Sequence, residues 1–157
     1  MRQRHGLLRG AILVGLAAVA VGCSTGGQMT KSSDDLVAER QRLMKLNGAS
    51  WKDVQDKVKA GNIDAVAVNA ETMAQNAMRI PSYFPEGSMN DKSKAKPEVW
   101  QKWPEFEAAS KNMVAESEKL RDAAMAKNAA GVQAIVKDFG KNACGTCHTP
   151  FRVPPKS

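Results

Sequence analysis

Five consecutive residues near the C-terminus, Cys144-Gly145-Thr146-Cys147-His148, constrain this chain more than any other feature of its sequence. The pattern C-x-x-C-H is the attachment signature of a c-type haem. Two thiols on one turn of helix can each form a thioether with a haem vinyl group, and the His that follows lies under the iron as its proximal ligand. The sequence therefore predicts one covalent haem c, held by Cys144 and Cys147 with His148 on the iron.

Two other interpretations of the cysteine pair are weaker. A thiol–disulfide redox motif is expected near a βαβ pattern, and no segment of this chain alternates with the period of two that a strand requires. A structural zinc site needs about four nitrogen or sulfur ligands. Beyond the leader described next, the chain offers only His148 and the distant Cys23 in addition to the pair.

Residues 1–22 have the composition of an export signal, with three arginines ahead of an apolar run over 11–21 that is too short to span a bilayer. Val21-Gly22-Cys23 resembles a bacterial lipoprotein box. In that interpretation Cys23 is lipidated, residues 23–33 form a flexible tether, and the protein is held at a membrane surface. Ala18-Val19-Ala20 fits ordinary signal peptidase instead, so a soluble periplasmic form is the alternative.

The charge balance argues against nucleic-acid binding. Removing the leader takes away three arginines and no acids, which leaves 20 basic against 16 acidic residues and lowers the formal charge from +7 to +4. The lysines are scattered among acids with few aromatics between them, which is a poor match to a nucleic-acid surface. A mildly basic surface of this kind is suited to steering an acidic periplasmic or membrane redox partner.

Apolar residues at three- and four-residue steps predict four helices in a domain over 34–157. The first starts at the capping residues 32–34, is loosened at Asn47-Gly48 and ends at Gly61. The second is capped by Asn62 and stopped by Pro81, and a loop of about sixteen residues follows. The third opens at Pro104, and the fourth runs from near Ala130 into the cysteine motif. Four helices with short connections favour an all-α, antiparallel four-helix bundle around one covalent haem.

Three segments together resemble the class II cytochromes c, the cytochrome c′ family, over about residues 35–152. They are Arg40-Gln41-Arg42-Leu43-Met44-Lys45, Lys96-Pro97-Glu98-Val99-Trp100 and the ten residues from Ala143 to Arg152. The resemblance implies a haem on the last helix of an up-down-up-down bundle, consistent with the helix count.

The resemblance also implies roles for particular residues. In that family the residue four positions after an Arg of the first helix faces the distal side of the haem. Five-coordinate gas binders usually have Leu or Phe there, and low-spin electron carriers have a Met that ligates the iron. The corresponding residue here is Met44, although a Met on an apolar helical stripe also serves as core filler. By the same resemblance Arg40 lies near a haem propionate, Trp100 packs at the haem edge and Arg152 covers the proximal side.

These features predict a periplasmic monohaem cytochrome that carries single electrons through an iron ligated by His148 and Met44. The alternative is a five-coordinate cytochrome c′ that binds nitric oxide or carbon monoxide. We find no nucleophile or acid–base pair elsewhere that would indicate an enzyme. The small residues of 65–77 would permit the homodimer that is common in the family, although solvent-facing alanine is equally ordinary.

Overall fold

The computed structural model describes residues 31–155. The predicted export signal, Cys23 and the tether up to residue 30 lie outside the described residues. Over 31–155 every regular element is a helix, and strand-like pairing is limited to an isolated antiparallel bridge between Ala95 and Arg152. The predicted all-α class is therefore confirmed.

Helix α1 (Ser33–Lys59) begins at the predicted capping residues. Ser32 and Asp35 form a capping box, in which the Ser32 hydroxyl accepts from the Asp35 N–H at 3.2 Å and the Asp35 carboxylate accepts from the Ser32 N–H. The helix continues through Asn47-Gly48 without a break, contrary to the expectation that this pair would loosen it. Asn76 of the neighbouring helix donates to the Asn47 side-chain oxygen at 2.9 Å, which holds this point of α1 in place.

Helix α2 (Val66–Arg79) starts later than predicted. Gly61 has a φ of +77°, and residues 61–65 form tight turns instead of helix, so Asn62 is not the N-cap. The stop at Pro81 is confirmed, because α2 ends at Arg79 and Pro81 opens the short 3₁₀ helix η1 (Pro81–Tyr83). The proline ring fixes φ and removes a backbone donor, which ends the α-helical pattern.

The C-terminal half holds the other two rods of the bundle. After the short helix α3 (Glu98–Gln101), α4 (Trp103–Met125) carries Pro104 in its first turn, as predicted. Lys127, with a φ of +53°, turns the chain, and the Asn128 side-chain oxygen caps α5 (Ala129–Phe139) by accepting from the Gly131 N–H at 2.9 Å.

The fourth predicted helix is interrupted. A wide π-helical turn, η2 (Gly140–Gly145), separates α5 from α6 (Thr146–Phe151), so the expectation of one uninterrupted α-helix into the motif is wrong. The three segments together still run as one rod, which keeps the predicted bundle of four.

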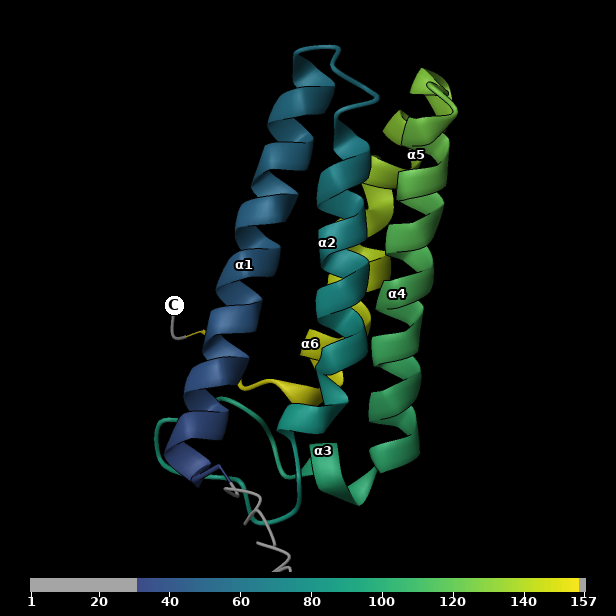
Figure 1. Ribbon diagram of the computed structural model, residues 1–157. Helices are drawn as coiled ribbons and strands as arrows, with labels where there is room; N and C mark the ends of the chain where they lie inside the picture. The colour runs from purple at the N-terminus through teal and green to yellow at the C-terminus, as the bar shows by residue number, and fades with distance from the viewer. Residues whose placement is uncertain (1–30, 156–157) are drawn as a thin grey trace, which may run out of the picture.

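Figure 1 shows α1, α2, α4 and the rod of α5 and α6 running alternately up and down, and α2 lies between α1 and α4. The loop over 84–97 passes beneath α1 and pairs with the end of α6. The Lys96 N–H donates to the Phe151 carbonyl at 2.9 Å and the Val153 N–H donates to the Lys94 carbonyl at 2.8 Å. Among the described residues, no helix has the length and apolar character to cross a membrane.

Candidate functional site

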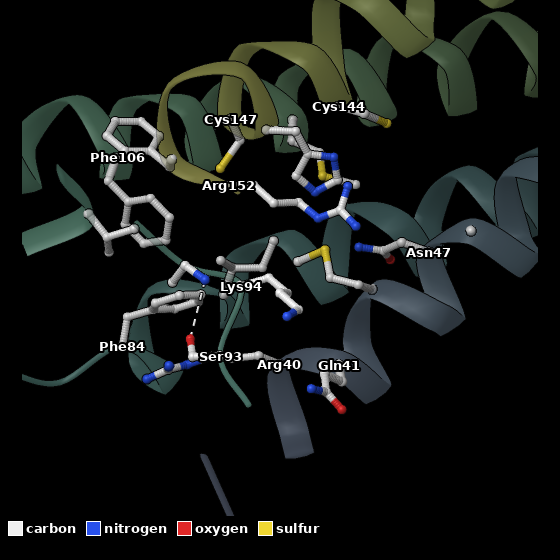
Figure 2. A pocket seen from close by; sticks show the side chains of 18 of the residues that line it. Arg40, Gln41, Asn47, Phe84, Ser93, Lys94, Phe106, Cys144, Cys147 and Arg152 are labelled. Carbon is white, nitrogen blue, oxygen red and sulfur yellow. Dashed lines mark hydrogen bonds between the residues drawn. The ribbon is translucent and has the colours of Figure 1, made fainter. Parts of the chain in front are cut away.

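A cavity of about 290 Å³ lies between α1 and the segment formed by η2 and α6 (Figure 2). The backbones of α1 and α6 are not in contact, so the space between them is filled by side chains or by a bound group. The wall on α1 is a helical stripe, whose members recur at three- and four-residue steps: Val37, Arg40, Gln41, Met44, Asn47, Gly48 and Trp51. The opposite wall is formed by Ala143, Cys144, Cys147, His148, Phe151 and Arg152.

Aromatic and apolar side chains from the other elements close the cavity. Phe106 of α4 is fully buried and lies edge-on to both Phe84 and Phe151, with ring centroids 4.8 and 5.4 Å away. Trp51 of α1 stacks on Phe139 at 4.8 Å and so joins α1 to the end of α5. The cavity is therefore an apolar chamber inside the bundle, with the loop residues 93–95 along one side.

The cysteine motif lies on the wall opposite α1. Cys144 belongs to the π turn, while Cys147 and His148 belong to α6, and all three are half-buried and line the cavity. The wide turn is supported from α4, because the Asn112 side-chain amide donates to the Asn142 carbonyl at 2.6 Å. π turns inside helices are frequent at functional sites, and this one places Cys144 on the cavity wall.

Burial decides the ionisation of this motif. Burial raises the pKa of the Cys144 thiol, and burial together with the neighbouring Cys144 raises the pKa of Cys147 to about 11. Both cysteines are free thiols in the described structure, and both are protonated at neutral pH. Burial, and to a lesser degree the charge of Arg152, lowers the pKa of His148, so its imidazole is neutral at pH 7 and has a nitrogen lone pair for a metal.

Met44 lies on the facing wall. It is half-buried, packs against the hydrophobic core and lines the same cavity as His148. The two candidate axial ligands are thus on opposite sides of one chamber. Met73 and Met113 also line it, but from α2 and α4.

Arg40 is a buried cation that no carboxylate within the described residues pairs. It is 6% exposed, and its Nε donates to the Tyr83 carbonyl at 2.6 Å. Its two Nη atoms donate to the backbone carbonyl (2.9 Å) and the hydroxyl of Ser88, and the guanidinium lies 4.1 Å from the Phe84 ring centroid. Burial lowers its pKa to about 10. Arg40 therefore fastens the loop after α2 to α1 and still places positive charge at the cavity.

Of the two remaining predicted site residues, Arg152 lines the cavity and Trp100 does not. Arg152 lines the cavity next to His148, and Figure 2 shows its side chain extending across it. Trp100 does not line the cavity. Its indole N–H donates to the Phe84 and Pro85 carbonyls at 2.9 and 3.0 Å, so it fixes the loop whose Phe84 side chain lines the cavity.

The sequence draws attention to Asn47 only through the pair Asn47-Gly48, and its role in the cavity was not predicted. Asn47 is 7% exposed, its oxygen accepts from Asn76, and its side-chain nitrogen has no hydrogen-bond partner. Loop residues Ser93 and Lys94 also line the cavity without any signal in their local sequence.

The side chains present fit a covalent haem. Two free thiols at C-x-x-C spacing and a neutral imidazole share one wall, a thioether faces them, and an unpaired buried cation and an unpaired amide donor line the chamber between. A structural zinc site fits less well. No group of three or more His, Cys, Asp or Glu side chains gathers within residues 31–155.

Comparisons with known proteins agree with this chemistry. A family model described as Cytochrome C′ matches residues 35–152. The chain is 29% identical over 120 residues to a cytochrome c-556 of Agrobacterium tumefaciens (strain II Chrys), covering 74% of this chain and 96% of that protein. It is 31% identical over 125 residues to a cytochrome c′ of Pararhodospirillum photometricum, covering 77% of this chain and 98% of that protein.

Solved structures show the same fold. A nitric oxide complex of a variant cytochrome c prime from Alcaligenes xylosoxidans has a TM-score of 0.71 at 22% identity, over 80% of this chain and 99% of that one. Another cytochrome c′, described as having ligand-controlled dimer dissociation, has a TM-score of 0.72 at 21% identity, over 80% and 99% of the two chains. At these identities the likeness concerns the fold alone.

Proposed function

The chain belongs to the cytochrome c′ family, whose members carry one covalently bound haem c, and we propose that it is a monohaem electron carrier with His148 and Met44 as the axial ligands of the iron. The observation that carries this proposal is the position of Met44, which lines the same cavity as His148 from the opposite wall. The family resemblance at this position supports it, because electron-carrying members have Met where gas binders have Leu or Phe.

The residues of the cavity have distinct roles in this proposal. When bound, the haem supplies a one-electron couple between ferric and ferrous iron. Cys144 and Cys147 hold it covalently, and His148 donates its neutral imidazole nitrogen. Met44 would offer a neutral, soft sulfur from the wall opposite His148, and such a ligand would favour the ferrous state and raise the reduction potential. With both positions filled, the site binds neither water nor substrate, which is why we propose a carrier rather than an enzyme.

The two arginines add charge to the site. Arg40 has Nη–H groups to spare beyond its bonds to Ser88, and a carboxylate such as a haem propionate would pair its buried charge. Arg152 lies beside His148, where its charge adds to burial in lowering the pKa of the imidazole and would oppose positive charge on the iron.

A second candidate function is the binding of nitric oxide or carbon monoxide at an open or easily opened distal position. The comparisons taken without Met44 favour this candidate, because the matched family model and one relative are named cytochrome c′. It requires that the Met44 sulfur stays off the iron or leaves it readily. Met44 is only half-buried, and its unbranched side chain has three rotatable bonds with which to swing aside.

The proposed setting follows from the leader. Export by residues 1–22 places the domain in the bacterial periplasm, and a lipid on Cys23 would hold it at the membrane surface near membrane redox proteins. The mildly basic surface would steer an acidic partner towards it. A homodimer through α2 is also proposed, because Val68 and Met78 are exposed on that helix.

The test is the reaction of the reduced protein with carbon monoxide. In the carrier, Met44 must leave before the gas binds, so we expect slow and weak binding that Met44→Leu makes at least tenfold faster. The matched control is Met113→Leu, which makes the same chemical change in the wall on α4 and leaves the rate unchanged. Equally fast binding in the unsubstituted protein and in Met44→Leu would refute the carrier and support the gas binder.

A further inference from the structure

The amide nitrogen of Asn47 is a buried polar group of the cavity that the proposed roles leave unused. Asn47 is more than nine-tenths buried, and its oxygen is occupied by the 2.9 Å hydrogen bond from Asn76. Its Nδ2 has no partner in the described structure. Figure 2 shows this nitrogen directed towards the interior of the cavity.

A buried donor without a partner is destabilising, and nearly all buried polar groups in proteins are paired. The Asn47 nitrogen is out of reach of bulk water. An acceptor bound in the cavity beside α1 would supply the missing partner. A neutral amide N–H needs an acceptor, and none of the described residues places one within hydrogen-bond distance of this nitrogen.

The position of Asn47 on α1 indicates which acceptor it serves. Asn47 follows Met44 by three residues, so the two lie on the same face of the helix, about 4.5 Å apart along the axis. It follows Arg40 by seven residues, about 10.5 Å along the axis. Arg40 lies at the end of the cavity that suits a carboxylate. Asn47 lies within one turn of Met44, which is on the wall opposite His148.

We propose that Asn47 is a positioning residue of the distal side, whose Nδ2–H would donate a hydrogen bond to the ligand that faces His148 across the haem. The accepting atom would be the Met44 sulfur in the resting carrier, or the terminal oxygen of a diatomic gas, which would bind the iron through its carbon or nitrogen. This inference rests on the proposed haem site and applies to both candidate functions. Because Asn76 fixes the Asn47 oxygen, the donor keeps a set direction and makes the distal side selective for groups that accept a hydrogen bond.

The substitution Asn47→Leu tests this inference, with Ser117→Ala as the matched control. Ser117 is also fully buried with an unpaired polar atom, but it lies on α4 and does not line the cavity. Both substitutions remove a buried unpaired group. Only Asn47→Leu is expected to change the hydrogen bond to the iron's distal ligand, and with it the spectroscopic signals of that ligand.

Two readouts distinguish the acceptors. In the reduced carbon monoxide complex, a donor to the gas oxygen lowers the C–O stretching frequency, so Asn47→Leu raises it. In the oxidised protein, a donor to the Met44 sulfur draws electron density away from iron, so Asn47→Leu shifts the far-red sulfur-to-iron band and lowers the reduction potential. A change in one readout assigns the acceptor to the gas or to the sulfur, and no change in either overturns the inference.

A measurement without substitution guards against a variant that fails to fold. In the unsubstituted protein, exchange into D₂O is expected to shift the C–O stretch of the carbon monoxide complex, because the amide proton becomes a deuteron. An unchanged stretch would overturn the hydrogen bond to the gas. If the unsubstituted protein lacks the far-red band, Met44 ligation fails by itself, and the carbon monoxide readouts still decide the role of Asn47.

Discussion

Replacing Arg40 with Met should destabilise the protein by about 3 kcal/mol, because Arg40 joins two segments that are distant in sequence. The Tyr83 and Ser88 carbonyls, which accept at 2.6 and 2.9 Å, would lose their donors, and a buried acceptor without a donor costs about 1–3 kcal/mol. The stacking of the guanidinium on Phe84, at 4.1 Å, contributes roughly another 1 kcal/mol. Burying the guanidinium charge is itself unfavourable, because no carboxylate among the described residues pairs with it. Its removal therefore offsets part of the destabilisation.

The matched control is Arg42→Met, two residues along the same helix. The Arg42 side chain is half exposed and pairs with Glu39 at 2.8 Å, and surface pairs of this kind contribute little to stability because solvent screens them. The assay is guanidinium unfolding of the haem-loaded proteins, followed by far-ultraviolet circular dichroism. Equal losses of unfolding free energy in the two variants would refute the account of Arg40 as the fastening between α1 and the loop.

Three further outcomes follow from the site. In protein produced without haem, the alkylation rate of Cys147 should keep rising to about pH 11, because burial raises its pKa from 9.0 and the thiolate is the nucleophile; a plateau near pH 9 would contradict this. The haem-free protein should also lose stability as the pH falls below 6.5, because the unfolded chain binds a proton at His148 more readily than the folded one. Arg152→Met should raise the pKa of His148 in an NMR titration and so reduce that loss of stability. An unchanged pKa would show that the charge of Arg152 does not act on His148. Asn128→Ala removes the cap that Gly131 donates to and should cost about 1 kcal/mol in chemical denaturation, with a loss near zero showing that α5 needs no cap.

Much of the fold could be predicted from the sequence because its signals are local. The cap at Ser32, the stop at Pro81 and the opening at Pro104 each act within one turn of helix, and the structure has all three. The same is true of the α1 stripe, where helical spacing alone puts Arg40 and Met44 on one wall of the cavity.

The remainder depends on contacts between distant segments. The π turn is supported by Asn112, which lies thirty residues before Asn142 and donates to its carbonyl. No local sequence pattern predicts this turn. Trp100 is the last residue of a segment that resembles the family, but its indole N–H donates to carbonyls of the loop after α2, and the side chain does not line the cavity. The Asn47 nitrogen is recognisable as unpaired only once Asn76 is seen to occupy the oxygen.

The most direct test of the central claim is the far-red absorption spectrum of the purified, oxidised protein. If the Met44 sulfur and the His148 nitrogen ligate the iron from opposite walls of the cavity, the spectrum will show the weak sulfur-to-iron band. Met44→Leu will abolish this band, and Met113→Leu will retain it. A high-spin spectrum without that band would contradict the account and make the distal side an open site for gas.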